Sequence, residues 1–225
     1  MLELGLDTGD RIGIWSPNKL EWVVTLFASA KIGLILVNIN PAYRISELEH
    51  ALNQVECKAL VTACSFKSSD YVSMIKELAP EISEDAEKGL NSKRLPHLEH
   101  LIAITDQDID GFYRFDEISR ELSEESTVLL SEKAHSLNPD DPINIQFTSG
   151  TTGLPKGATL SHFNILNNAY SVGDAMKFTP KDRLCIPVPL YHCFGMVMGV
   201  LCCLTHGATM IFPGEGFEPL DVLVA

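Results

Sequence analysis

Short apolar runs alternate with amphipathic stretches over roughly the first third of the chain, and this alternation restricts the fold more than any other feature. Residues 11–15 predict a strand, 18–31 a helix and 34–39 a second strand. Gly33 stands between that helix and the second strand, where a left-handed cap is expected. The pattern predicts an α/β fold, with a mostly parallel layered sheet, right-handed crossovers and helices on the sheet's faces.

The same alternation continues beyond the second strand. Ser46 and Glu49 have the spacing of a capping box, which predicts a helix from there to about residue 55. Apolar runs predict further strands at 58–63 and 101–105, with a helix at 69–78 between them. The strands at the start of the chain are therefore expected to belong to one sheet.

Two polar and acidic segments, at about 80–97 and 106–141, interrupt the alternation. Charge runs of this kind usually form solvated surface, and we interpret both segments so, with one short helix at 116–122. No repeat of fixed period is visible. A length of 225 residues then favours one large domain, or part of one, over residues 1–225.

Composition excludes several classes of partner. The formal charge of −13 opposes binding to nucleic acids or to an anionic bilayer, which require a basic surface. The six cysteines form no C-x-x-C pair, which favours a reducing compartment. His97 and His100 have no nearby thiol or carboxylate cluster to complete a tetrahedral site, so we interpret them as structural or solvated and expect no metal site.

The longest uninterrupted apolar run covers residues 194–204. It is shorter than the roughly 20 residues that a transmembrane helix needs, and it predicts a buried helix instead. The start of the chain shows neither a secretory signal nor an Arg-rich transit peptide.

The residues that indicate chemistry begin after Pro142. A strand at 143–147, a loop at 148–157 and a strand at 158–160 precede a helix that Ser161 caps and that runs to about residue 174. Glycines in such a loop let successive N–H groups face an anion, and hydroxyl and ammonium groups add donors for phosphates. These donors and glycines are Thr148, Ser149, Gly150, Thr151, Thr152, Gly153 and Lys156.

A flexible turn is the alternative interpretation of a Gly, Ser and Thr cluster. A turn has no need for two glycines, four hydroxyls, a proline and a lysine between two strands, so we favour a triphosphate site. A Walker A loop is excluded, because Lys156 is flanked by Pro155 and Gly157 rather than leading directly into a helix.

The loop TSGTTGLPKG at 148–157, followed by SHFN at 161–164, resembles the signature loop of the adenylate-forming superfamily of acyl-CoA synthetases, luciferases and nonribosomal adenylation domains. A second block, PLYHCFG at 189–195, resembles the family's next motif. The segments GDR at 9–11 and NINPAYR at 38–44 resemble its early structural motifs. Within the family, the chain is most similar to mitochondrial medium-chain acyl-CoA synthetases.

The resemblance implies a two-step reaction with ATP, Mg²⁺ and CoA. A fatty acid carboxylate attacks the α-phosphorus of ATP, pyrophosphate leaves, and the CoA thiol then attacks the acyl-adenylate. By the same resemblance Lys156 and Thr152 assist the departure of pyrophosphate, and His192 lies beside the acyl carboxylate with Tyr191 and Phe194. The implied ATP-binding residues are Thr148, Ser149, Gly150, Thr151, Thr152, Gly153, Leu154, Pro155 and Lys156.

Two of these assignments have plain structural alternatives. A single histidine after a strand is more often a structural residue, and only the flanking match favours a functional His192. The run 194–204 could line an acyl tunnel, but Met196, Val197, Met198 and Val200 are equally suited to an ordinary core. The medium-chain substrate therefore comes from resemblance alone.

The chain is further expected to be an incomplete N-terminal domain without its C-terminal domain, and inactive by itself. Residues 1–5 resemble the last turn of a helix with a glycine cap, and residues 217–225 open a helix. The resemblance implies a mitochondrial location and small-molecule partners only, and it leaves the oligomeric state open. Two alternatives remain, namely an adenylating enzyme without CoA transfer and a nucleotide-binding protein without catalysis.

Overall fold

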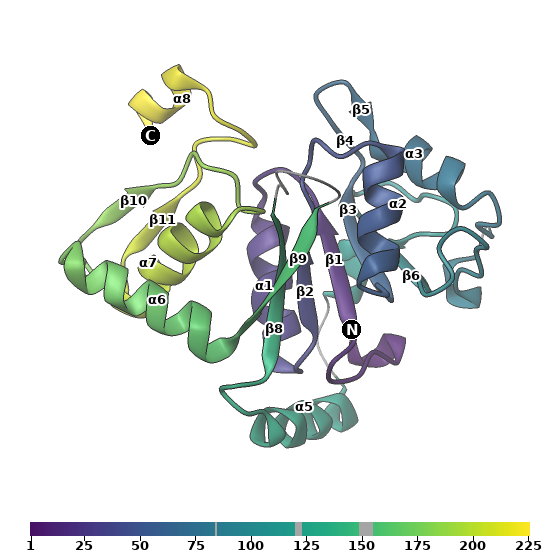
Figure 1. Ribbon diagram of the computed structural model, residues 1–225, viewed down its shortest axis with the longest axis horizontal. Coiled ribbons are helices and arrows are strands. Elements are labelled where there is room, and N and C mark those ends of the chain that lie inside the picture. Colours follow the sequence, from purple (N-terminus) through teal and green to yellow (C-terminus); the bar gives the residue numbers. More distant parts are fainter. Residues whose placement is uncertain (84, 120–122, 149–154) are drawn as a thin grey trace.

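The computed structural model describes residues 1–83, 85–119, 123–148 and 155–225. Within these residues the centre is a seven-stranded sheet in the order β7-β6-β3-β1-β2-β8-β9 (Figure 1). All neighbouring strands in it are parallel except β8 and β9, which are antiparallel. The strands are β1 (Arg11–Trp15), β2 (Ile35–Asn38), β3 (Ala59–Ala63), β6 (His100–Ile104), β7 (Tyr113–Arg114), β8 (Pro142–Thr148) and β9 (Lys156–Ser161).

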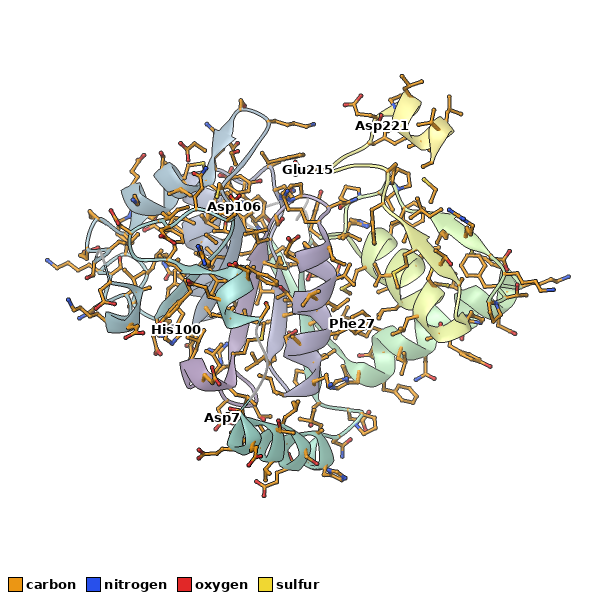
Figure 2. All side chains as sticks on the ribbon, turned by 180° about the vertical axis from the view of Figure 1, so that it is seen from behind. Asp7, Phe27, His100, Asp106, Glu215 and Asp221 are labelled. Atoms are coloured by element: carbon orange, nitrogen blue, oxygen red, sulfur yellow. The ribbon has the colours of Figure 1, made fainter. Side chains whose placement is uncertain are left out.

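Helices cover both faces of this sheet, as a parallel sheet requires. α1 (Leu20–Lys31) lies over one face, which Figure 2 presents, and α2 (Ile45–Gln54) and α3 (Tyr71–Leu78) lie over the other. Successive residues of the strands point to opposite faces, so Ile14 joins the core under α1 and Trp15 the core under α2 and α3. The predicted mostly parallel α/β fold is confirmed.

A smaller layer follows β9. It contains α6 (His162–Ala175), the π-helix η3 (Phe194–Leu201), α7 (Cys202–His206) and a two-stranded parallel sheet of β10 (Arg183–Cys185) and β11 (Thr209–Ile211). Met196 and Val200 of η3 and Ala169 of α6 lie in the same core as Trp22 of α1. The smaller layer thus packs against the α1 side of the large sheet. The short helix α8 (Pro219–Val224) ends the chain.

The remaining elements are short or peripheral. The chain opens with the 3-10 turn η1 (Leu2–Leu4), and Gly5 follows at φ 75°, as the expected glycine cap requires. Gly33 also has a left-handed φ of 73°. The others are β4 (Ser65–Phe66), β5 (Ser69–Asp70), η2 (Ala86–Lys88), α4 (Phe115–Ile118) and α5 (Glu124–Ser136).

The predicted capping box of Ser46 and Glu49 is wrong. The helix already begins at Ile45, so Ser46 lies inside its first turn and cannot stand before it. The carboxylate of Glu47 instead accepts a hydrogen bond from the Arg44 N–H at 3.2 Å. Glu49 is thereby left on the helix surface, where it binds the guanidinium of Arg94.

The acidic segment 106–141 holds more helix than the sequence analysis predicts. α4 ends at Ile118, residues 120–122 lie outside the described part, and α5 then forms a 13-residue helix. Ser123 caps α5, because its hydroxyl accepts from the Ser126 N–H at 3.1 Å. Only Ser126 of α5 is buried. A helix with so little buried surface carries no apolar period, which explains why the sequence pattern did not reveal it.

Candidate active site

The strands β8 and β9 frame the predicted phosphate loop. Thr148, the last residue of β8, is paired in register with Lys156, the first residue of β9, two residues earlier than the predicted start at 158. The Thr148 hydroxyl donates a hydrogen bond to the Lys156 carbonyl oxygen at 3.3 Å. Both residues are exposed, so the hydroxyl and ammonium donors are presented to solvent where the loop leaves the sheet.

Six of the predicted ATP ligands lie outside the described residues, namely Ser149, Gly150, Thr151, Thr152, Gly153 and Leu154. Thr148, Pro155 and Lys156 are described, and Pro155 is half-buried. The two strands that the sequence predicted on either side of this segment are confirmed by the β8 and β9 pairing.

The helix after β9 begins as predicted. The Ser161 hydroxyl accepts from the Asn164 N–H at 3.2 Å, and the Asn164 side-chain oxygen accepts from the Ser161 N–H at 3.0 Å. This reciprocal pair is a capping box and fixes where α6 leaves the sheet. Burial lowers the pKa of the neighbouring His162, whose Nε2 is buried and has no hydrogen-bond partner among the described residues.

His192 lies on an exposed loop just before η3. The Phe194 N–H donates to Nδ1 of His192 at 3.1 Å, so Nδ1 acts as an acceptor and the neutral ring carries its proton on Nε2. The thiol of Cys193 is 3.6 Å from the same Nδ1. The outward Nε2–H is therefore the group that His192 offers to a carboxylate.

The loop that carries His192 is closed by its own backbone. The His192 N–H donates to the Pro189 carbonyl at 3.2 Å, and the His192 carbonyl accepts from the Met196 N–H at 3.1 Å. Gly195 lies so close to this turn that a Cβ there would be 2.4 Å from the Pro189 oxygen. Only glycine fits this approach, which explains its place in the PLYHCFG block.

Asparagine side chains attach this loop to the large sheet. Asn18 donates to the Val188 carbonyl at 2.9 Å and accepts from the Leu190 N–H at 2.8 Å. Asn38, the last residue of β2, donates to the Tyr191 carbonyl at 3.1 Å. The sequence analysis predicted this role for neither residue, although asparagine at the buried strand position of Asn38 is unusual enough to have signalled it.

The apolar run 194–204 is only partly the buried helix that was predicted. It forms the π-helix η3 and then α7, and Met196, Val197 and Val200 lie in the core. Met198 and Leu204 are exposed, as is Phe194. The core interpretation therefore holds for those three buried residues, and Phe194 and half-buried Tyr191 remain beside His192 on the surface. A π-helix of this kind often marks a functional site.

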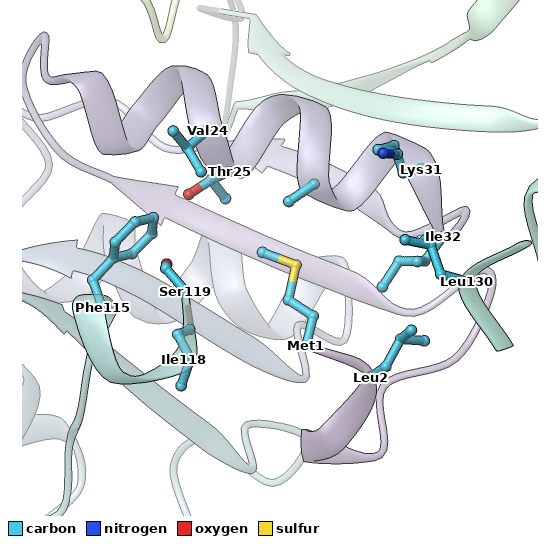
Figure 3. Close-up of a pocket in the computed structure, with 11 residues that line it drawn as sticks. Met1, Leu2, Val24, Thr25, Lys31, Ile32, Phe115, Ile118, Ser119 and Leu130 are labelled. Carbon is cyan, nitrogen blue, oxygen red and sulfur yellow. The ribbon is translucent and has the colours of Figure 1, made fainter. Parts of the chain in front are cut away.

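An apolar pocket lies elsewhere on the molecule, between α1, η1, α4 and α5 (Figure 3). It shares no residue with the β8 and β9 frame or with the His192 loop, so we do not count it as part of the candidate site. Its lining includes Met1, Leu2, Val24, Thr25, Phe115, Ile118 and Leu130.

Two further kinds of site are absent from the described residues. In that part of the chain, no three His, Cys, Asp or Glu side chains gather closely enough to hold a metal ion. No helix in the same part combines the length and apolarity needed to cross a membrane.

The sequence matches the family described as AMP-binding enzyme over residues 1–224. It is 47% identical over 220 residues to a mitochondrial medium-chain acyl-CoA ligase, ACSF2, of Danio rerio, an alignment that covers 97% of this chain and 36% of the relative. It is 41% identical over 223 residues to the putative acyl-CoA synthetase YngI of Bacillus subtilis (strain 168), covering 99% of this chain and 40% of that protein. The chain thus spans well under half the length of these relatives.

Solved structures give the same fold. The crystal structure of the anthranilate CoA ligase AuaEII in complex with anthranoyl-AMP superposes with a TM-score of 0.74 at 23% sequence identity. The match covers 95% of this chain and 37% of that one. At this identity the likeness concerns the fold, and it agrees with the sheet and helix order described above.

Proposed function

Since this chain belongs to the AMP-binding enzyme family, we propose that it is the N-terminal part of a fatty acid–CoA ligase. The observation that carries the proposal is the 47% identity to a medium-chain acyl-CoA ligase over 97% of the chain. The proposed reaction joins a fatty acid to CoA at the expense of ATP. Medium-chain substrates and a mitochondrial location follow from the same relative and belong to the proposal.

Lys156 is the described residue that acts in the first part of the proposed mechanism, together with Thr152 of the same motif. The carboxylate oxygen forms a bond to the α-phosphorus of ATP, and the bond from that phosphorus to pyrophosphate breaks. The exposed Lys156 ammonium lies where the predicted phosphate loop joins the sheet, so it can donate to the departing phosphates. Donors held in place before the reaction stabilise developing charge without reorganising. Thr152, Ser149 and the other loop donors belong to this group by the motif.

His192 orients the acyl group in this proposal. Its Nδ1 accepts from the Phe194 N–H, so the neutral ring directs Nε2–H outward as a single donor. Donation to one carboxylate oxygen leaves the other oxygen free to attack phosphorus. His192 gives up no proton in this step and acts by orientation. Tyr191 and Phe194 flank the acyl chain on the same loop.

CoA enters in the second step. The thiol loses its proton to solvent, its sulfur forms a bond to the acyl carbonyl carbon, the bond from that carbon to the AMP oxygen breaks, and AMP leaves with the electron pair. Magnesium accompanies ATP in the proposed reaction. The described residues provide no cluster of three acidic, histidine or cysteine side chains to hold it, so no step is assigned to the metal.

The proposal is tested by exchange of labelled pyrophosphate into ATP, measured on the full-length protein with straight-chain fatty acids of increasing length. Each buried methylene contributes about 0.8 kcal/mol, so exchange should rise with chain length until the acyl pocket is filled, at medium length. CoA-dependent release of AMP then distinguishes a CoA ligase from an adenylating enzyme without CoA transfer. ATP binding without exchange for any carboxylate would identify a nucleotide-binding protein and refute the proposal.

The 225-residue chain by itself is compared with the full-length protein in the same assay. Because it spans only 36% of its Danio rerio relative, we expect it to bind nucleotide without supporting exchange comparable to the full-length protein. Comparable exchange would mean that all groups needed for adenylation lie within these residues.

A further inference from the structure

Three asparagines lie buried between the large sheet and the loop that carries His192. Asn18, Asn38 and Asn144 are 6%, 2% and 0% exposed. A buried amide destabilises the fold unless its donors and acceptors are bonded, and strands are depleted in asparagine. Three such residues at one place therefore need a reason beyond sheet formation.

Asn144 of β8 fixes the orientation of Asn38 of β2. The Asn144 side-chain NH₂ donates to the Leu36 carbonyl and to the Asn38 side-chain oxygen, both at 2.9 Å. Since that oxygen of Asn38 is occupied as an acceptor, the NH₂ group of Asn38 points the other way, toward the Tyr191 carbonyl at 3.1 Å. The network thereby determines which side of the Asn38 amide faces the loop.

The loop is held from a second direction by Asn18, which lies before α1. Its side chain donates to the Val188 carbonyl and accepts from the Leu190 N–H, so it bonds the backbone on each side of Pro189. The backbone N–H of Asn18 also donates to the Glu215 carbonyl at 3.1 Å, and Figure 2 shows Glu215 beside the start of α1. Asn18 thus belongs to the general packing of the smaller layer, whereas Asn38 contacts the peptide next to His192.

The Tyr191 carbonyl and the His192 nitrogen belong to one peptide unit. Peptide units are planar, so a donor that fixes this carbonyl also restricts where the His192 side chain begins. An amide does this without introducing charge, which suits a site that must hold anionic carboxylate and phosphate groups.

We propose that Asn38, oriented by Asn144, is a positioning residue for His192. It acts through the Tyr191 carbonyl and touches neither substrate nor nucleotide. The inference rests on the proposed role of His192 in adenylation. The part that concerns the loop itself stands on the hydrogen bonds alone and can be tested without catalysis.

The first test is amide hydrogen exchange on the 225-residue chain. Asn38→Asp keeps the oxygen that accepts from Asn144 and places a second oxygen against the Tyr191 carbonyl. Asn38→Leu removes both the group that donates to Tyr191 and the group that accepts from Asn144. If the Leu variant does not fold, the Asp variant decides the test. We expect the Leu190 and His192 amides to exchange about tenfold faster than in the parent chain, because the loop opens locally.

Thr62→Val is the matched control. Thr62 is also fully buried in a strand of the same sheet, one residue before the end of β3, where its hydroxyl donates to the Trp15 and Ala63 carbonyls, but it does not bond the His192 loop. In Thr62→Val, the amide exchange rates should change near β1 and β3, and those of residues 188–192 should equal the rates of the parent chain. Equal exchange at 188–192 in all the variants and the parent would overturn the proposal.

The second test uses the full-length protein and separates kcat from KM. With His192 displaced, kcat for acyl-adenylate formation should fall between about tenfold and a hundredfold in Asn38→Asp, and KM for ATP should stay within about twofold. Thr62→Val should keep the parent kcat. Faster loop exchange with an unchanged kcat would refute positioning for the reaction. If the parent shows no adenylation at all, the proposed function fails while the exchange result still decides whether Asn38 holds the loop.

Discussion

The two ends of the parallel strands carry polar groups of different kinds. At the amino ends, Lys58 forms an ion pair with Asp10 at 2.9 Å, and Arg11 forms one with Glu56 at 2.9 Å. The charged side chains there are therefore paired with near neighbours beside the sheet. At the carboxyl ends, Asn38 is uncharged and bonds the backbone of the distant His192 loop. Thr148 ends β8 where the predicted phosphate loop begins.

This difference distinguishes an end of the sheet where charged groups pair locally from an end where a polar group bonds a distant segment. Ion pairs at the amino ends are satisfied locally and contribute little beyond the sheet itself. The carboxyl ends of parallel strands all meet at one edge, which is where ligands bind in α/β sheets. There the neutral amide of Asn38 bonds both Tyr191 of the PLYHCFG block and Asn144 of β8, the strand that leads into the predicted phosphate loop. We therefore expect changes at the carboxyl end to affect either folding or catalysis strongly, and changes at the amino end to affect neither by much.

The largest expected effect concerns Trp15, at the carboxyl end of β1. It is fully buried, stacks on Tyr71 with ring centroids 3.7 Å apart, and donates from Nε1 to the Asn40 carbonyl at 3.1 Å. Trp15→Ala should lower the free energy of unfolding by about 3–5 kcal/mol, measured by urea denaturation followed by circular dichroism. The control is Tyr170→Ala. Tyr170 is 57% exposed, so this substitution should lower the free energy of unfolding by less than about 0.5 kcal/mol. Equal losses in both variants would contradict the burial argument.

Lys156 tests catalysis at the same edge. Lys156→Ala in the full-length protein should slow ATP–pyrophosphate exchange by about a hundredfold to a thousandfold, because a preorganised donor to the leaving phosphates is lost. CoA transfer from preformed acyl-adenylate should change far less. Unfolding should be unaffected, since the side chain is exposed. Lys181→Ala, also exposed, serves as the control, and equal losses in both half-reactions would assign Lys156 a structural role.

Gly195 tests the fit of the His192 loop. In Gly195→Ala the new methyl group meets the Pro189 carbonyl oxygen at 2.4 Å, and backbone cannot yield as a side chain can. We expect a loss of about 1–3 kcal/mol in the free energy of unfolding, measured by denaturant titration. Gly214→Ala is the control, because the nearest atom there is 3.7 Å away. A neutral Gly195→Ala would show that the loop can shift, and would weaken the claim that it is held in place.

The smallest effect is expected at the amino end. The Asp10 carboxylate, hydrogen-bonded to Lys58, raises the pKa of Lys58 above its ordinary value. A raised folded pKa stabilises the fold below the unfolded pKa of about 10.4, and this stabilisation is lost as pH rises through the folded value. Because the pair is partly exposed, Lys58→Met should cost below about 1 kcal/mol at neutral pH.

The pH dependence provides the check on Lys58. Thermal unfolding of the parent chain and of Lys58→Met should differ slightly at neutral pH, begin to converge above about pH 10.4, and coincide once the pH has passed the raised folded pKa of Lys58. Lys67→Met, for a lysine without an acidic partner among the ion pairs of the described residues, is the control. A large effect of Lys58→Met at neutral pH would contradict the comparison between the two ends of the sheet.

The sequence predicted the large sheet well, because its strands and helices have strong local patterns. Buried parallel strands such as β1 and β3 are mainly apolar, and Gly33 and Ser161 are terminal signals that need only a few neighbouring residues to act. The predicted capping box at Ser46 was wrong because two glutamates each lie three residues after a possible cap: Glu49 after Ser46, and Glu47 after Arg44. Which of the two acts depends on where the helix begins, and the packing of the helix decides that start.

The sequence by itself determined the class of fold, the strand, loop, strand setting of the phosphate motif, and the residues Lys156 and His192 as candidates. Only the tertiary structure revealed that Asn18 and Asn38 hold the His192 loop, because these contacts join residues 170 and 153 positions apart in the chain. It also decided that Met196 and Val200 belong to the core. Local patterns depend on neighbours within a few residues, whereas a hydrogen bond between distant segments exists only after packing has brought them together.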